Sequence, residues 1–437
     1  MQDKVFQLID QECQRQQHKI GLIPSENNSS PKVSQVLGSC LSNKYSEGYP
    51  GRRYYEGNQI IDQLEALAIA RIKKLFQVPH VNVQPYSGSP ANSAIYFALL
   101  EPGDTLMGLA LASGGHLTHG HPKVTFSGRY FHSVQYGLNR QARVDFQALR
   151  ALAKKYQPQV IVAGNTAYPF QLDFARFREI ADEVGAWLVA DISHITGLVV
   201  AGEHPSPFTT ADVVMSTTHK TFRGPRGAMI LVTKQGLKRD ADLAKKIDKA
   251  VFPGLQGGPH NATTAAIAVA AQEAGTKRFK KYARQIRQNA QALATALQNQ
   301  DLKLVGNGTE THLMLIDLTP FGTSLGPQVA YALDVAGIYA NYNTIPNEPG
   351  SPFYPSGLRI GTPLVTTRGM KEPEMKQIAA WIAQVITVVK DQPLPQNNSQ
   401  RQQFLKDFKN QITKNQVLKE INQQVKELTK DFPLFKW

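Results

Sequence analysis

Two charged residues stand near the ends of two apolar stretches that predict buried strands. Lys220 closes the stretch from Asp212 to Lys220, which is rich in β-branched residues and precedes a turn at Gly224–Gly227. Asp191 lies in a second apolar stretch, from Ala186 to His194. Open α/β sheets bind ligands at the carboxyl ends of their strands, so we expect the amine and the carboxylate to lie close together. A lysine that can form a Schiff base and a carboxylate that can keep a pyridine nitrogen protonated are what pyridoxal phosphate requires.

A turn of small residues predicts a place for the phosphate of that cofactor. Ser87–Ser89 precede a helical pattern, and Pro90 suits the first position of the helix. The first amides of a helix have no partner within it and bind phosphate readily. The glycines at 114–115 would let the backbone approach the cofactor ring, on which His116 would stack.

Each of these features also has an ordinary structural interpretation. A lysine or aspartate at the end of a strand is usually solvated or caps a turn, and a serine-glycine turn is common in loops. Their joint occurrence in this order favours the cofactor site. His194 and His219 lie beside the two key residues, and each could equally be a hydrogen-bonded histidine of the core.

Six longer motifs follow one another from about residue 20 to the C-terminal region. They are Leu22–Asn27, Asn43–Gly57, Gly114–Gly120, Thr217–Gly227, Val251–Pro259 and Gly357–Pro363. In this order they closely resemble the motifs of the serine hydroxymethyltransferase family.

This resemblance implies an α/β fold of the aspartate-aminotransferase type. Its large pyridoxal-phosphate domain has a mostly parallel, seven-stranded sheet between helices, and a smaller C-terminal α/β domain and an N-terminal arm complete it. The implied reaction is the reversible transfer of the serine hydroxymethyl group to tetrahydrofolate, which gives glycine and 5,10-methylenetetrahydrofolate in one-carbon metabolism. The implied assembly is a homodimer, which could pair again into a tetramer, with active sites shared across the interface.

The resemblance also assigns residues to the cofactor. Lys220 would form the Schiff base and join His219 in the catalytic set, Asp191 would pair with the ring nitrogen, and His116 would stack on the ring. The other implied contacts are Ser87, Gly88 and Ser89 to the phosphate, Thr166 and His194 near the ring hydroxyl, and Gly257 and Gly258 reaching from the partner subunit.

Substrate residues follow from the same resemblance. The carboxylate of serine needs a planar two-point partner, and Arg359, assisted by Ser25, matches the family's arginine. Glu47 would exchange a proton with the substrate hydroxyl or position the folate, and Tyr55 would act beside it. Tyr45 and Tyr55 would line the pocket from the neighbouring subunit.

Folate contacts are implied at Leu111, Gly115, Leu117 and Asn343. The two leucines could equally belong to the core, whereas Asn343 lies in a segment typical of the family.

The sequence departs from the usual family pattern at a few positions near these motifs. Pro24, Tyr86 and Pro90 replace residues that are more often alanine, histidine and glutamine. Glu56, beside Tyr55, replaces a common glycine, and its carboxylate could repel the glutamate tail of folate or simply face water.

Length and composition agree with a large enzyme. A chain of 437 residues that is 42% hydrophobic can bury more than one core. We expect an N-terminal arm over residues 1–40 that contacts a partner subunit, a large cofactor domain over 41–270 and a small domain over 271–437. A helical pattern rich in alanine and glutamine over 260–300 would connect the last two.

The predicted environment is the cytoplasm. The polar N-terminal segment lacks the apolar stretch of a signal peptide, and no segment reaches the ~18 apolar residues of a membrane span. Cys13 and Cys40 have neither metal-site spacing nor a disulfide pattern.

Charge and chemistry leave alternatives to the transferase. The net charge of +14 and basic clusters such as Lys277–Lys281 could bind RNA, but a solvated helix face is favoured because no RNA-binding motif accompanies them. A threonine aldolase would keep Lys220, Asp191 and Arg359 without needing Asn343 or a folate. A non-catalytic interaction protein ranks last, since it would be expected to have lost Lys220 or Asp191.

Overall fold

The computed structural model describes residues 3–395 and 397–435, which form two compact units. The larger unit is Asn27–Arg284, and the smaller unit combines residues 3–26 with 285–435. This division differs from the predicted ranges 1–40, 41–270 and 271–437. Of those ranges, residues 1–2, 396 and 436–437 lie outside the described residues. The functional domains and the role of the N-terminal arm in a dimer stay predictions.

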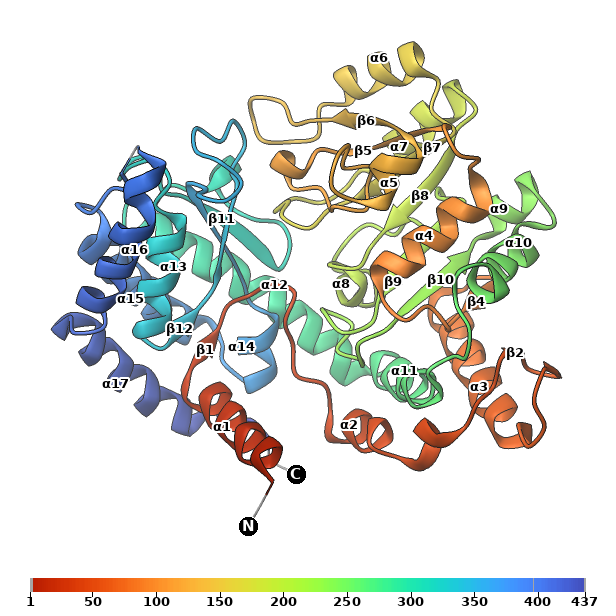
Figure 1. The fold of residues 1–437 in the computed structure, drawn as a ribbon, viewed down its shortest axis with the longest axis horizontal. Coiled ribbons are helices and arrows are strands. Elements are labelled where there is room, and N and C mark those ends of the chain that lie inside the picture. Colours follow the sequence, from red (N-terminus) through yellow and green to blue (C-terminus); the bar gives the residue numbers. More distant parts are fainter. Residues whose placement is uncertain (1–2, 396, 436–437) are drawn as a thin grey trace. The chain divides into compact units, whose positions relative to one another are not determined.

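The larger unit is built on a seven-stranded sheet (Figure 1). Its order is β4 (His80–Asn82), β10 (Ala228–Val232), β9 (Val213–Thr217), β8 (Trp187–Asp191), β7 (Val160–Gly164), β5 (Thr105–Leu109) and β6 (His132–Tyr136). The strands from β9 to β6 are parallel, and β10 runs antiparallel to both of its neighbours. The prediction of a mostly parallel sheet is therefore confirmed.

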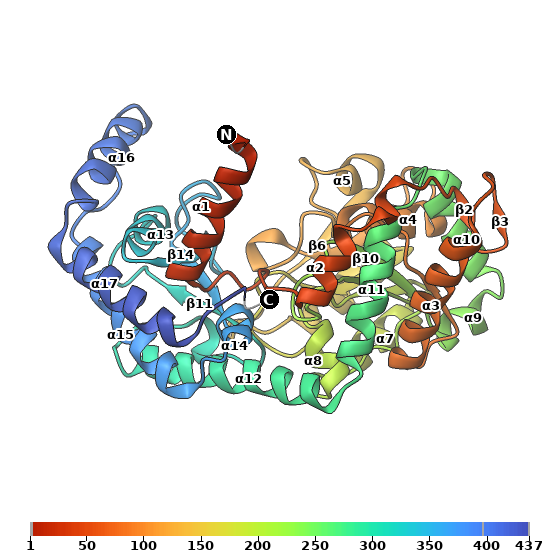
Figure 2. The ribbon, with the colours of Figure 1, turned by 90° about the horizontal axis from the view of Figure 1, so that it is seen from below.

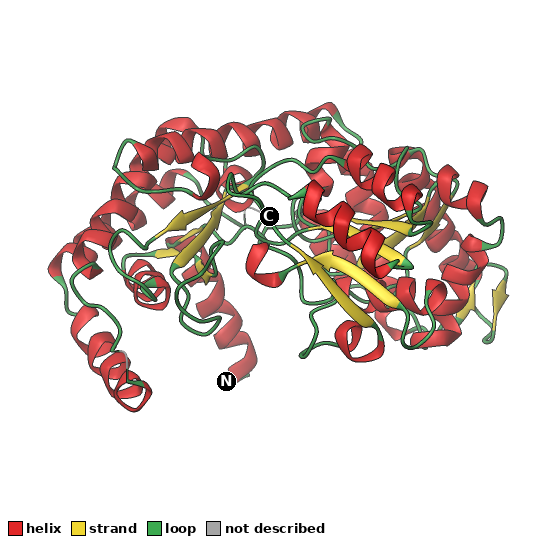
Figure 3. Cartoon of the chain, turned by 90° about the horizontal axis from the view of Figure 1, so that it is seen from above, coloured by secondary structure: helices red, strands yellow, loops and turns green. Residues whose placement is uncertain are grey.

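The central strands are apolar because both of their faces are covered. Every residue of β7 and β9 is buried, as expected for interior strands of a parallel sheet. Helices lie on both sides of the strands (Figure 3). They are α4 (Gly88–Leu99), α5 (Phe126–Tyr130), α6 (Phe146–Tyr156), α7 (Phe174–Glu183), α8 (Thr196–Ala201), α9 (Lys234–Arg239) and α10 (Leu243–Lys249).

The helices begin at recognisable caps. Asp145 and Asp173 precede α6 and α7 and accept hydrogen bonds from the first free backbone amides of those helices. In α4, Ala91, Ala94 and Ile95 pack against the apolar residues of the sheet. This packing fixes the start of α4 near the carboxyl end of β9.

The remaining helices of the larger unit lie beside the sheet. Helix α11 (Asn261–Ala274) packs against α2 (Pro31–Leu37) and α3 (Gln59–Phe76) (Figure 2). The hairpin of β2 (Gly48–Tyr49) and β3 (Arg52–Arg53) precedes α3. The helical pattern predicted over 260–300 is broken after α11, and α12 (Lys277–Gln298) begins a separate helix that runs into the smaller unit.

The smaller unit has its own sheet and apolar core. Strand β14 (Gly357–Gly361) lies between β11 (Leu313–Asp317) and β13 (Asn341–Asn343), antiparallel to both. Its helices are α1 (Lys4–His18), α13 (Gly326–Val335), α14 (Pro363–Arg368), α15 (Glu372–Val389), α16 (Asn398–Ile412) and α17 (Gln416–Asp431).

The N-terminal segment belongs to the smaller unit for a definite reason. Strand β1 (Ile20–Gly21) pairs in parallel with β12 (Ile338–Tyr339), and Arg368 donates hydrogen bonds to the carbonyl oxygens of Gln17 and Lys19. These contacts join residues that are more than 300 positions apart in the sequence.

Candidate active site

The residues predicted at the ends of strands do gather at one edge of the larger sheet. Parallel β7 and β8 are in register at Gly164 and Asp191, and β8 and β9 at Asp191 and Met215. Thr166 follows β7, and Lys220 follows β9. Strand β9 ends earlier than predicted, at Thr217, because the chain turns where Thr218 bonds to Pro225 and Gly227. Lys220 therefore lies in the turn beyond the strand.

A glycine loop reaches the same edge. The backbone amides of Thr166 and Ala167 both donate to the carbonyl oxygen of Gly114, at 2.8 and 3.1 Å. Gly114 has a φ of +94°, and a Cβ atom on Gly115 would collide with the carbonyl oxygen of Leu109. The two glycines are thus required by geometry, and they place His116 next to the end of β7.

Asp191 is a buried, ionised carboxylate. His119 Nε2 and Asn92 Nδ2 approach its Oδ2 at 2.8 and 3.2 Å, and the backbone amide of Ser193 donates to Oδ1 at 3.0 Å. Burial by itself would raise the pKa of Asp191, but the hydrogen bond from His119 and the other favourable interactions outweigh it and hold the pKa well below its usual value. Oxygen Oδ1 has one backbone donor and capacity for a further one, so it fits a protonated ring nitrogen.

His119 and Asn92 were not among the predicted site residues. His119 lies in the motif Gly114–Gly120, which was noted for its resemblance only, and Asn92 follows the serine-glycine turn. Both reach Asp191 from far along the chain, 72 and 99 positions away. The signal available in the sequence was that each is a polar residue within a few positions of a predicted cofactor contact.

The start of α4 fits a phosphate group. Ser87 is the N-cap and has an extended backbone, and its hydroxyl accepts no hydrogen bond from the first amides of the helix. A Cβ atom on Gly88 would lie 2.7 Å from Thr217 Cγ2, so only glycine permits this approach to β9. The buried hydroxyl of Thr217 has no partner in the described part of the chain. The first amides of α4 and the hydroxyl groups of Ser87 and Ser89 are the donor set that phosphate prefers.

The prediction for Pro90 needs a correction. Helix α4 begins at Gly88, so Pro90 occupies the third helical position and not the first. It is tolerated there because amides of the first turn have no acceptor within the helix.

The turn around Lys220 is tightly fixed. Asn27 Nδ2 and the backbone amide of Arg223 donate to the carbonyl oxygen of Lys220, both at 3.0 Å. His194 is buried, and its carbonyl oxygen accepts a hydrogen bond from Thr221 Oγ1 at 2.9 Å. Burial, assisted by the positive charges of Lys220 and Arg226, lowers the pKa of His219 to about 3. His219 is therefore neutral at physiological pH.

Tyr45, Glu47 and Tyr55 form a second group within the larger unit. The rings of Tyr45 and Tyr55 meet edge to face at 5.2 Å, and both side chains are exposed. A Cβ atom on Gly257 would lie 3.1 Å from Glu47 Oε1, and one on Gly258 would lie 3.0 Å from the ring of Tyr45. The structure therefore brings together the residues that the resemblance assigned to the partner's site.

Tyr86, one of the departures from the family pattern, supports this group. Its hydroxyl donates to the carbonyl oxygen of Gly258 at 2.8 Å, and its ring stacks on His260 at 4.2 Å. Gln256 accepts from the backbone amide of Tyr86 and donates to the carbonyl oxygen of Gln84. The loop that carries Gly257 and Gly258 is thus tied to the residue that precedes Ser87.

Arg359, Ser25 and Asn343 belong to the smaller unit. Arg359 is buried in the middle of β14, and its Nε donates to Asn341 Oδ1 at 3.0 Å. Burial lowers the pKa of Arg359 to about 10, which leaves the guanidinium charged at neutral pH. Asn343 lies on the neighbouring strand opposite Gly357, and the backbone near Ser25 is fixed by a hydrogen bond between Gly361 and Leu22.

The two predicted folate leucines differ in exposure. Leu111 is partly buried in a short 3₁₀ helix (Leu111–Ser113), whereas Leu117 is 39% exposed and is not a core residue. Gly115 lies between them.

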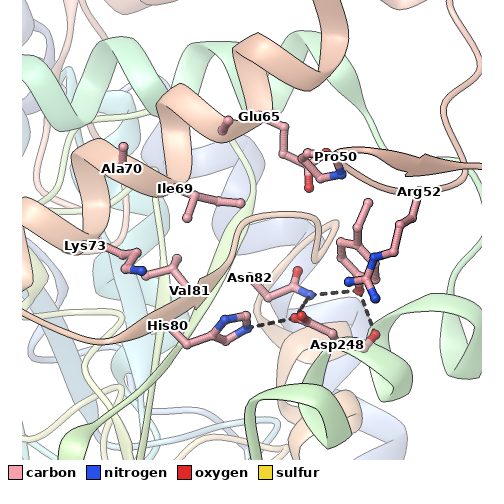
Figure 4. A pocket seen from close by; sticks show the side chains of 12 residues that line it. Pro50, Arg52, Glu65, Ile69, Ala70, Lys73, His80, Val81, Asn82 and Asp248 are labelled. Atoms are coloured by element: carbon pink, nitrogen blue, oxygen red, sulfur yellow. Dashed lines mark hydrogen bonds and ion pairs between the residues drawn. The ribbon is translucent and has the colours of Figure 1, made fainter. Parts of the chain in front are cut away.

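A pocket of about 500 Å³ lies elsewhere on the larger unit, between the β2–β3 hairpin, α3 and β4 (Figure 4). Asp248 in this pocket accepts hydrogen bonds from Asn82 and His80 at 2.8 and 2.9 Å, and the Tyr49 hydroxyl donates to its backbone carbonyl. None of the predicted cofactor residues lines it, and its hydrogen bonds serve to fix the hairpin.

The described residues contain neither a candidate metal site nor a candidate membrane span. Within residues 3–395 and 397–435, no group of three histidine, cysteine, aspartate or glutamate side chains could hold a metal ion. In the same ranges, none of the helices combines the length and the apolar character that crossing a membrane demands.

Comparison with known proteins gives a consistent result. The profile of the serine hydroxymethyltransferase family matches residues 1–382. A serine hydroxymethyltransferase of Acidothermus cellulolyticus is 59% identical over 386 residues, which cover 88% of both chains. Those of Sorangium cellulosum and Desulfotalea psychrophila are 57% and 53% identical, over 89% and 92% of this chain and 90% and 93% of theirs. Because the family profile and these relatives match the chain along most of its length, the chain belongs to the serine hydroxymethyltransferase family.

Proposed function

We propose that the carboxyl edge of the larger sheet is the cofactor site of this enzyme. As a member of its family, the chain is a pyridoxal-phosphate enzyme that transfers the hydroxymethyl group of serine to tetrahydrofolate and forms glycine. The observation that carries the site is the placement of Asp191 at the end of β8 and of Lys220 just beyond the neighbouring parallel strand β9. The threonine aldolase alternative is not favoured, because all the relatives compared are named for the transferase.

The residues at this edge match the parts of the cofactor. Lys220 would hold it covalently, Asp191 would keep the ring nitrogen protonated, and His116 would cover one face of the ring. Ser87, Gly88 and Ser89 would bind the phosphate, while Thr166 and His194 would lie near the ring hydroxyl. When bound, the cofactor supplies an electron sink for the bond that breaks at the α-carbon of serine.

The substrate residues act through charge and orientation. Arg359, assisted by Ser25, would bind the serine carboxylate through two parallel hydrogen bonds, which fixes the amino acid in one orientation. Glu47 would exchange a proton with the serine hydroxyl group, and Tyr55 would lie beside it. Neutral His219 could accept a hydrogen bond near Lys220. Leu111, Gly115, Leu117 and Asn343 would contact the folate.

We also propose that active sites are shared between two copies of the chain. The two tyrosines of the second group are exposed, Tyr45 at 57% and Tyr55 at 45%, and the adjacent Tyr54 is 75% exposed. Large apolar groups rarely stay in water unless they serve binding, so a partner subunit is the expected cover. Analytical ultracentrifugation of the purified protein distinguishes a dimer from a tetramer formed by two such dimers. Free, exposed Cys13 and Cys40 support a reducing compartment, the cytoplasm.

Removal of the Lys220 amine tests the cofactor site. Lys220→Ala should lose serine-to-glycine turnover and the absorbance band of the attached cofactor together, whereas the exposed Lys234→Ala should keep both. Borohydride reduction followed by peptide mass analysis should find the cofactor on Lys220 in the unaltered enzyme. A cofactor trapped on another lysine would contradict the assignment.

The same preparation tests the reaction. Serine cleavage is measured with and without tetrahydrofolate, and threonine cleavage is measured in parallel. We expect serine turnover to depend on folate. Strong threonine cleavage without any effect of folate would favour the aldolase.

A further inference from the structure

Asn92, in the second turn of α4, connects groups that surround the proposed cofactor site. Its side chain is fully buried, and its Nδ2 lies 2.8 Å from Thr118 Oγ1 and 3.2 Å from Asp191 Oδ2. An ionised carboxylate only accepts hydrogen bonds, so the atom that faces Asp191 must be the amide nitrogen and not the oxygen. Both hydrogens of the amide are therefore used, one by each partner.

Thr118 passes this constraint to His116. Because Thr118 Oγ1 accepts from Asn92, its own hydrogen can be donated to His116 Nδ1, which lies 2.8 Å away. The backbone amide of Thr118 also donates to this Nδ1, at 3.1 Å. A ring nitrogen that accepts hydrogen bonds carries no proton, so His116 is neutral with its proton on Nε2.

His119 is held in the same form on the other side of the network. Its Nδ1 accepts the backbone amide of His116 at 3.3 Å, and its Nε2 lies 2.8 Å from Asp191 Oδ2. The proton of His119 is therefore on Nε2, where it is donated to the carboxylate. Asp191 thus receives hydrogen bonds from neutral donors: His119, Asn92 and the backbone amide of Ser193.

We propose that Asn92 is a positioning residue that, through Thr118, keeps His116 in the neutral Nε2–H form. Asn92 also helps to hold Asp191 as an ionised carboxylate whose charge no neighbouring imidazolium neutralises. The proposal rests on the proposed function for the identity of the ligand. A charged imidazolium at His119 would neutralise the Asp191 carboxylate and weaken its attraction for a protonated ring nitrogen. Asn92 also ties this charge to α4, whose first residues form the proposed phosphate site.

The first readout is cofactor affinity, measured by equilibrium dialysis with pyridoxal phosphate. Asn92→Ala should raise the Kd by about 10- to 100-fold, which corresponds to the loss of one hydrogen bond to a charged group. Asn289→Ala is the matched control. Asn289 is also fully buried and donates twice, to Thr366 Oγ1 and the carbonyl oxygen of Met370, but in the smaller unit. The Asn289→Ala variant should be less stable than the unaltered protein, but its Kd for pyridoxal phosphate should be unchanged.

The second readout is the protonation of the ring nitrogens, measured by nitrogen-15 NMR on histidine-labelled protein with and without the cofactor. Signals are assigned with His116→Gln and His119→Gln. At neutral pH both rings should show an unprotonated Nδ1 and a protonated Nε2. Thr118→Val, which keeps the shape of the side chain, should change the His116 signals and leave those of His119 in place, even if Asn92→Ala folds poorly.

Two results would overturn the proposal: a proton on Nδ1 of His116 or of His119 in the unaltered protein, or a Kd for Asn92→Ala that equals that of Asn289→Ala. Neither readout uses serine. An unaltered protein that binds the cofactor but does not cleave serine would therefore contradict the proposed function and leave this inference standing.

Discussion

Replacing Arg53 by methionine should separate the stability of the larger unit from the placement of Glu47. The Arg53 side chain is almost fully buried and forms ion pairs with Asp62 at 2.8 Å and Glu65 at 2.7 Å. Its Nη1 also donates to the carbonyl oxygens of Ser46 and Gly48, at 2.9 and 2.8 Å, which flank Glu47. One guanidinium group thus compensates buried charge and fixes the backbone on both sides of a proposed catalytic residue.

The magnitude follows from the burial of Glu65. Its side chain is 3% exposed, and Arg53→Met would leave it with one hydrogen bond from Gln84 and no cation. Breaking a buried ion pair on one side costs about 3–5 kcal/mol. Burial already raises the pKa of Glu65, so the carboxyl group would take up a proton in the variant, which limits the loss. For a unit of this size, about 2–4 °C per kcal/mol gives a decrease in Tm of about 6–20 °C.

The assay is calorimetry together with steady-state kinetics on three variants: Arg53→Met, Glu65→Gln and the double variant. Removing both charges leaves no deeply buried, uncompensated ion, since Asp62, the other partner of Arg53, is 27% exposed to water. The double variant should therefore recover at least about 2 kcal/mol relative to Arg53→Met. The kcat of both Arg53→Met and the double variant should be lower than that of the unaltered enzyme, because in both the carbonyl oxygens of Ser46 and Gly48 have lost their donor. Arg150→Met is the control, since its pairs with Glu179 and Glu183 are exposed and should be worth under about 1 kcal/mol.

Two results would refute this reasoning separately. A double variant no more stable than Arg53→Met would show that the buried charge of Glu65 is not what the arginine compensates. A double variant that regains full kcat would show that Arg53 does not position Glu47.

Three further predictions concern the site. Mixing inactive Lys220→Ala with inactive Glu47→Gln under conditions that exchange subunits should restore about a quarter of the activity, because random pairing gives hybrid dimers with one intact shared site; no recovery despite proven exchange would mean that each chain builds its own site. Arg359→Lys should raise the KM for serine by about 10- to 100-fold through loss of two-point binding, whereas Arg368→Lys, at another buried arginine of the smaller unit, should lower Tm and leave KM unchanged. The pKa of His219 is lowered to about 3 in the folded chain, so this histidine binds a proton more readily when the chain is unfolded. Its contribution to stability is therefore present above its ordinary pKa of 6.5 and is lost as the pH falls toward 3. As the pH is lowered between these limits, Tm should fall less in His219→Gln than in the unaltered protein, and equal slopes would contradict a neutral, buried His219.

The sequence determined the parts of this protein whose signals are local. Apolar stretches predicted the central strands, and these are buried on both faces as expected. Lys220 and Asp191 were found because each lies near the end of such a stretch, and parallel strands bring their carboxyl ends to one edge of the sheet. The glycines at 114 and 115 were likewise readable, since close approach of backbones admits no other residue.

Only the tertiary structure decided which polar groups meet. His119 and Asn92 contact Asp191 across 72 and 99 residues, and Arg53 reaches Ser46 and Gly48 only because the hairpin folds back on itself. The N-terminal segment joins the C-terminal part of the chain in the smaller unit through pairing of β1 with β12, and no local sequence pattern predicts this pairing. Strand and helix periodicity is set by neighbours along the chain, whereas a buried hydrogen bond depends on which distant donor the packed core leaves within reach of an acceptor.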